Sequence, residues 1–153
     1  MKRVFKVVIA LSGFLFVLTS TVIPQETSLC DLIGKSTGNV IKKFGNPLHQ
    51  DKSNPAMQCI YYQSKSSRMA FIADNAGVYQ IQADYYYDSK SAADNAINRF
   101  VTKCYKDSMQ VDTVNVKEFK IYGSGLRASL TLFENNFSKK YEVKLQADRS
   151  ENK

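Results

Sequence analysis

The 153-residue chain contains no tryptophan, one histidine, three cysteines, three prolines and seven glycines. Three cysteines are too few for a disulfide scaffold, and so little proline and glycine excludes collagen-like and low-complexity chains. Hydrophobic residues make up 44% of the sequence and charged residues 23%. We therefore expect an ordinary globular protein in which a hydrophobic core supplies most of the stability.

Few residues are placed to carry out catalysis. The acidic side chains are spread singly along the chain, and His49 is the single histidine. A zinc site usually needs three or four ligands, and a nucleophilic cysteine needs a base within hydrogen-bonding distance. We therefore predict no metal, no cofactor and no enzymatic activity. The alternative is a thiol-dependent enzyme with Cys30 or Cys59 as nucleophile and His49 as base.

The N-terminal segment predicts export. Lys2, Arg3 and Lys6 precede an apolar run from Val7 to Ile23, which is the layout of a Sec signal peptide. We expect residues 1–23 to be this signal and residues 24–31 to be a linker. The mature protein would then be periplasmic or secreted. Because the run is nearly long enough to span a bilayer, an uncleaved anchor helix is the alternative.

Two helices and two groups of strands are predicted after the linker. Ser36 is suited to cap the first helix and Gly45 to end it. The polar loop 46–56 that follows holds His49 and Asp51 and is a candidate binding loop. The predicted helices are 32–45 and 88–105, and the predicted strands are 57–62, 69–73, 79–87, 111–116, 119–122, 126–133 and 141–147, with a kink at Lys117–Glu118 that joins 111–116 and 119–122.

This order predicts a single α+β domain over residues 32–148, followed by a polar tail at 149–153. It consists of tandem α-βββ units, 32–87 and 88–148. Hairpin-type connections predict an antiparallel sheet with two helices packed on one face.

The first predicted helix also carries a family resemblance. The stretch from Leu32 to Pro47, followed by tyrosine-rich strands, resembles the "IGxSxxxVxxxxGxP then xYxY" opening of SmpA/OmlA-type envelope proteins. It is also similar to the β-lactamase-inhibitor-like domains. The resemblance implies a secreted or periplasmic module without enzymatic activity that works through protein–protein contact. It implies no catalytic residues, since neither group is defined by any.

The three cysteines leave several pairings open. Cys59 is predicted to face the core from a strand and Cys104 lies on the apolar stripe of the second helix, so a Cys59–Cys104 disulfide could cross the helix–sheet interface. A pair that involves Cys30 and three unpaired thiols are the alternatives.

Tyrosine is unusually frequent, with nine residues. Strand alternation predicts that Tyr62 and Tyr86 face away from the side that holds Tyr61, Tyr85 and Tyr87. Tyrosine provides a large, rigid contact area and is enriched at interfaces. Tyr62 and Tyr86, together with His49 and Asp51, are therefore the candidate partner-binding residues.

The sequence thus predicts a secreted or periplasmic, non-enzymatic module that binds another protein of the envelope or extracellular space. The alternative is an envelope structural or assembly protein held by its uncleaved signal helix, whose only membrane contact would be that segment. Because the cations are scattered among acids, no nucleic-acid partner is predicted.

Overall fold

The computed structural model describes residues 29–123 and 125–150. In chain order the elements are η2 (Cys30–Leu32), α1 (Thr37–Phe44), β1 (His49–Asp51), β2 (Gln58–Gln63), β3 (Ser67–Asp74), β4 (Gly77–Tyr87), α2 (Lys90–Lys106), β5 (Gln110–Asn115), β6 (Glu118–Gly123), β7 (Leu126–Asn135) and β8 (Lys140–Arg149). The fold is α+β, an antiparallel sheet with two α-helices.

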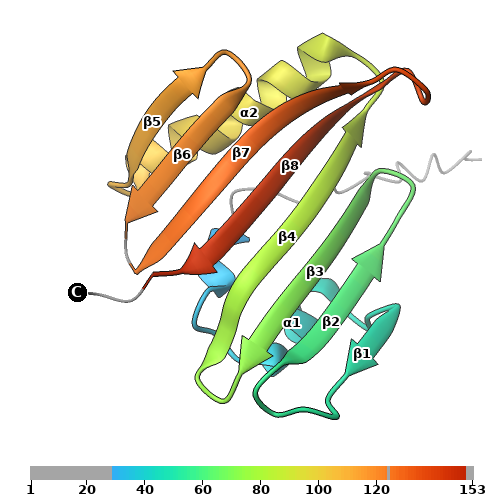
Figure 1. Ribbon diagram of the computed structural model, residues 1–153, viewed down its shortest axis with the longest axis vertical. Helices are drawn as coiled ribbons and strands as arrows, with labels where there is room; N and C mark the ends of the chain where they lie inside the picture. Colours follow the sequence, from blue (N-terminus) through green and yellow to red (C-terminus); the bar gives the residue numbers. More distant parts are fainter. Residues whose placement is uncertain (1–28, 124, 151–153) are drawn as a thin grey trace, which may run out of the picture.

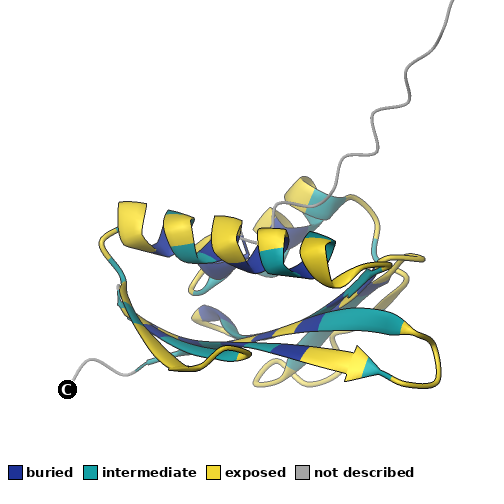
Figure 2. Ribbon diagram, turned by 90° about the horizontal axis from the view of Figure 1, so that it is seen from above, coloured by how far each residue is buried: buried dark blue, intermediate teal, exposed yellow. Residues whose placement is uncertain are grey.

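The sheet has eight strands in the order β1-β2-β3-β4-β8-β7-β6-β5 (Figure 1). Each half of the chain supplies a helix and a four-stranded meander, and the last strands of the two meanders, β4 and β8, pair at the centre. Both helices lie on the same side of the sheet (Figure 2). The predicted α+β class and the helices on one face are confirmed, but each unit is α-ββββ instead of α-βββ.

Two strands account for that difference. The predicted loop 46–56 contains β1, a three-residue edge strand that pairs with β2. In the second unit, the predicted kink at Lys117–Glu118 is a chain reversal, because β5 and β6 pair antiparallel. Asn115 Oδ1 accepts a hydrogen bond from Lys117 N at 2.8 Å, which stabilises the turn between them.

Helix α1 is shorter than the predicted 32–45, since Cys30–Leu32 forms the separate turn η2, but its two end signals are those that the sequence indicated. The Ser36 side chain accepts a hydrogen bond from Asn39 N at the N-terminus, and Gly45 ends the helix with φ of 78°. Phe44 anchors the helix on the sheet, with its ring centroid 5.5 Å from that of Tyr62 and 5.5 Å from that of Phe71. The short helix is thus held by packing, as its length requires.

Helix α2 covers the second meander and the central strands. Ser89 caps it by accepting from Ala92 N. It contacts β4, β5 and β8. Its buried stripe consists of Ala93, Ala96, Ile97, Phe100 and Cys104. Within the part of the chain that the structure describes, no helix is long and apolar enough to cross a membrane.

The ends of the predicted domain differ in their environment. The predicted signal peptide 1–23 lies outside the described residues, as does the linker 24–31 up to residue 28. Leu29 and Cys30, at the end of that linker, are buried in the core. In the predicted tail 149–153, Arg149 ends β8 and bonds Asp74, and residues 151–153 are outside the described part.

Candidate functional site

Among the described residues, one face of the sheet carries no helix, and we call it the outer face (Figure 2). Strand alternation assigns side chains to it, since neighbours along a strand point to opposite sides. In β4 the buried residues Ile81, Ala83 and Tyr85 face the helices. Gln82 and Tyr86 therefore lie on the outer face.

The outer face carries a cluster that we call the Tyr86 patch, made of Tyr61, Arg68, Asp84 and Tyr86. The guanidinium carbon of Arg68 lies 5.5 Å from the ring centroid of Tyr86. Arg68 Nη2 also donates to Asp84 Oδ2 at 3.0 Å, and Arg68 and Asp84 are direct cross-strand neighbours. Burial raises the pKa of Tyr86, so its hydroxyl stays protonated at neutral pH and can donate a hydrogen bond.

Tyr61 extends the patch toward the sheet edge. It pairs with Ala70 of β3 and with His49 of β1, and its hydroxyl donates to Gln63 Oε1 at 2.9 Å. Directly opposed residues of antiparallel strands share a face, so His49 also lies on the outer face. His49, Tyr61 and Tyr86 therefore share the outer face, on β1, β2 and β4.

Asp51 lies at the β1 edge of this face. It is exposed and pairs with Cys59. The hydrogen bond from Ser53 N, at 2.8 Å, lowers the pKa of the Asp51 carboxyl. The Asp51 side chain is therefore a negatively charged carboxylate at neutral pH, at this end of the outer face.

Tyr62 is placed differently from the prediction. It is only 8% exposed and lies in the core, where its hydroxyl donates to Gly45 O at 2.9 Å. Its ring also meets that of Phe71 edge-on, with centroids 6.0 Å apart. The predicted shared outer face of Tyr62 and Tyr86 is therefore wrong, because β2 pairs with β3 in the register that turns Ile60 and Tyr62 toward the helices.

The register of β2 against β3 also decides on which side of the sheet Cys59 lies. Cys59 pairs with Ile72 and Asp51 on the outer face, whereas Cys104 points inward from α2. The sheet separates the two thiols, so of the alternatives left open by the sequence a Cys59–Cys104 disulfide does not fit this structure. Cys30, Cys59 and Cys104 are all free thiols in this structure.

None of the thiols is activated. Burial raises the pKa of Cys30 to about 12 and that of Cys104 to about 11. Burial and the nearby Asp51 carboxylate also raise the pKa of Cys59. A nucleophilic cysteine needs a lowered pKa, and among the described residues no group of histidine, cysteine and acidic side chains could hold a metal ion.

The thiols of the folded, reduced protein should react in a fixed order. We expect iodoacetamide at pH 8 to label Cys59 first, since Cys30 and Cys104 are 4% exposed. Because the pKa of Cys59 is raised, its labelling rate should keep rising as the pH passes 9, and Asp51→Asn should increase the rate at pH 8 by roughly twofold or more. Mass spectrometry of tryptic peptides measures each site, and a rate that levels off near pH 7 would contradict this prediction.

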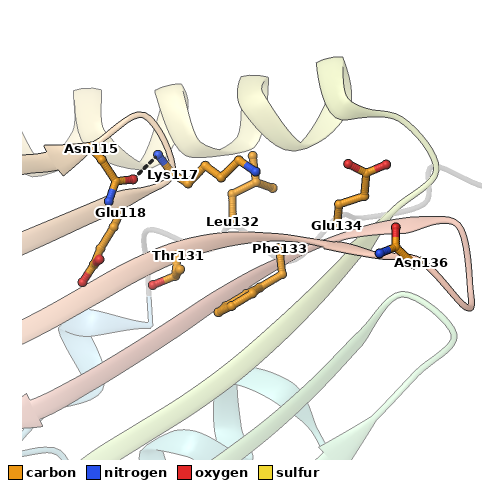
Figure 3. A pocket seen from close by; sticks show the side chains of 8 residues that line it. All are labelled: Asn115, Lys117, Glu118, Thr131, Leu132, Phe133, Glu134 and Asn136. Atoms are coloured by element: carbon orange, nitrogen blue, oxygen red, sulfur yellow. Dashed lines mark hydrogen bonds between the residues drawn. The ribbon is translucent and has the colours of Figure 1, made fainter.

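A hollow of about 490 Å³ lies beside the β5–β6 turn. Figure 3 shows Leu132 and Glu134 on the side of α2, whereas Thr131 and Phe133 point to the other side of β7. Lys144 Nζ covers the Phe133 ring, 4.9 Å from its centroid. Since these side chains diverge, the hollow provides no common point for a small ligand.

The described residues form an α+β module whose two α-helices lie on one face of an antiparallel sheet. No protein-family model matches the chain, and no curated protein sequence matches it.

Two solved structures are similar in fold. One is an extracellular protein containing a SCP domain from Bacillus anthracis, with a TM-score of 0.45, 13% identity and 79% of this chain covered. The other is a cysteine-rich secretory protein from Staphylococcus aureus, with a TM-score of 0.44, 10% identity and 78% of this chain covered. The chain spans 45% of the length of each. The predicted resemblance to SmpA/OmlA-type proteins and β-lactamase-inhibitor-like domains is wrong, since no family model matches the chain and neither similar structure carries such a description.

Proposed function

We propose that this chain is an exported, non-enzymatic module that binds a protein partner through the outer face of its sheet. The observation that carries the proposal is the Tyr86 patch, in which Arg68 lies against the ring of Tyr86 on the face that no helix of the described chain covers. Tyrosine and arginine are the residue types most enriched at energetically important positions of protein interfaces.

The geometry of the patch supports this role. Arg68 retains 48% exposure of its side chain while Asp84 and Tyr86 hold it in place. A preordered side chain loses less conformational freedom on binding than a mobile one. The patch is therefore built for contact with a second surface, and His49 and Asp51 would enlarge that contact toward the β1 edge.

Export is the second part of the proposal, and the signal-like segment 1–23 supports it. The raised pKa values of the thiols argue against the alternative of a thiol-dependent enzyme, since a thiol that stays protonated is a poor nucleophile.

Alanine substitutions test the proposed surface. We expect Tyr86→Ala and Arg68→Ala to weaken partner binding by about tenfold or more, because each removes one half of the stacked pair. The melting temperature should change little, since neither residue is in the core. The partner is first captured by a photo-crosslinking amino acid at position 61, and affinities are then measured with the purified partner.

The matched control is Tyr105→Ala. Tyr105 is 57% exposed and lies on α2, on the opposite side of the molecule from the patch. It should leave binding unchanged. Equal losses for Tyr86→Ala and Tyr105→Ala, or crosslinking at position 105 as strong as at 61, would overturn the proposed surface.

A further inference from the structure

Cys30 and Cys104 lie on two segments that approach each other, the segment before α1 and the end of α2. Cys30 begins η2 and Cys104 ends the buried stripe of α2. Both side chains are 4% exposed and belong to the same hydrophobic cluster.

Their neighbours confirm that the two segments are in contact. Cys30 and Asp31 line a single hollow of about 300 Å³ together with Lys103 and Asp107. Asp31 raises the pKa of Lys103, and both Cys104 and Asp31 lie near enough to Cys30 to raise the pKa of its thiol. The two thiols thus lie in the same core, on neighbouring segments that line one hollow.

We propose that Cys30 and Cys104 form a disulfide in the exported protein, while Cys59 stays a free thiol on the outer face. The proposal rests on the proposed export, because disulfides persist in oxidising compartments. It does not depend on partner binding through the Tyr86 patch. The bridge would close the chain from residue 30 to residue 104 and so tie the N-terminal segment to α2.

The oxidant is a disulfide, either of an exported thiol–disulfide oxidoreductase or of a small molecule such as oxidised glutathione. One cysteine thiolate attacks it, forms a mixed disulfide and releases one thiol. The second thiolate then attacks the cysteine sulfur of that mixed disulfide and releases the second thiol. Two thiols of the protein are oxidised, one external disulfide is reduced to two thiols, and both protons pass to the released thiolates.

The structure also sets when this can happen. In the folded protein the buried thiols are protonated and covered, with a pKa of about 12 for Cys30 and about 11 for Cys104. In the unfolded chain a cysteine has an ordinary pKa of about 8.5. An external disulfide would therefore react slowly with the thiols of the closed core, and once the bridge has formed the same burial protects it from reductants.

Refolding in a glutathione redox buffer tests the proposal. The chain without its first 23 residues is unfolded, reduced, refolded, alkylated under denaturing conditions and digested with trypsin without reduction. Lysines separate the three cysteines, so each lies on its own tryptic peptide. We expect one linked pair, from Cys30 and Cys104, and alkylation at Cys59 alone.

Cys59→Ser is the matched control and should keep the link. Reduction should lower the melting temperature of wild type and of Cys59→Ser by about 5 °C or more and leave that of Cys104→Ser unchanged. Alkylation of all three cysteines, glutathione adducts at Cys30 or Cys104 in place of the link, or an intrachain link to Cys59 would each overturn the proposal. Because the wild-type peptide map decides the matter, a variant that fails to fold does not affect the outcome.

Discussion

We expect Phe71→Ala to lower the free energy of unfolding by about 3–5 kcal/mol. Phe71 is 0% exposed and is among the largest fully buried side chains of the described residues. Its ring lies 5.5 Å from that of Phe44 and 6.0 Å from that of Tyr62. The substitution would leave a cavity where α1 meets the first meander, and the short helix would lose its main contact with the sheet.

Urea denaturation followed by circular dichroism measures the effect. Phe137→Ala is the matched control, because Phe137 is fully exposed in the β7–β8 turn. It should change the free energy of unfolding by less than about 0.5 kcal/mol. A loss below about 1.5 kcal/mol for Phe71→Ala would show that the core around α1 closes over the cavity or is packed differently.

We expect Gly77→Ala to destabilise the protein by about 3–5 kcal/mol. Gly77 has φ of 106°, and a Cβ there would lie 2.6 Å from Gly34 O and 2.8 Å from Lys35 O. The backbone comes this close because Gly34 N donates to Val78 O at 2.7 Å and Val78 N to Lys35 O at 2.8 Å. A methyl group would break this backbone pairing.

Gly125→Ala separates the two causes of that loss. Gly125 also has a positive φ, of 74°, but a Cβ there would meet nothing within 4 Å. Gly125→Ala should lower the free energy of unfolding only by the cost of the backbone strain, about 1 kcal/mol. The difference between the two variants is the cost of the collision with the segment at Gly34. Equal losses, measured by thermal and urea denaturation, would show that the segment can move away.

The sequence predicted the elements that have one clear hydrophobic period. In β4 the small and apolar residues alternate with polar ones, so its buried face was evident from Ile81 and Ala83. In β2 both faces carry apolar or aromatic side chains, including Ile60 and Tyr62 on one face and Cys59 and Tyr61 on the other. Alternation alone therefore cannot predict which face of β2 is buried. The pairing of β2 with β3 determines it.

The elements that were missed are short or polar. Strand β1 holds only His49, Gln50 and Asp51, which carry no hydrophobic pattern, and its pairing with β2 makes it a strand. The turn after β5 has no glycine, which is why it resembled a kink. Its signal was Asn115, whose side chain accepts from Lys117 N in a local turn.

The predicted partner-binding residues can be compared with the structure only in their placement. Three of the four candidates lie on the outer face: Tyr86, His49 and Asp51. Their role in binding stays a prediction. Tyr61 and Arg68 were missed, because their proximity to Tyr86 depends on the pairing of three strands. The available signal was an arginine within an otherwise apolar strand, which implies an exposed face opposite the core.

The central position of β8 has a consequence for the order of folding. Strand β8 follows the other seven strands in the chain, yet it lies between β4 and β7. Its contact with β4 joins Gln80 to Asp148 and Tyr87 to Tyr141, so the loop between paired residues is long. Such pairings are slow to form. While the chain is being synthesised, the edges of β4 and β7 stay unpaired until the last strand emerges, so the two halves cannot join into one sheet before then.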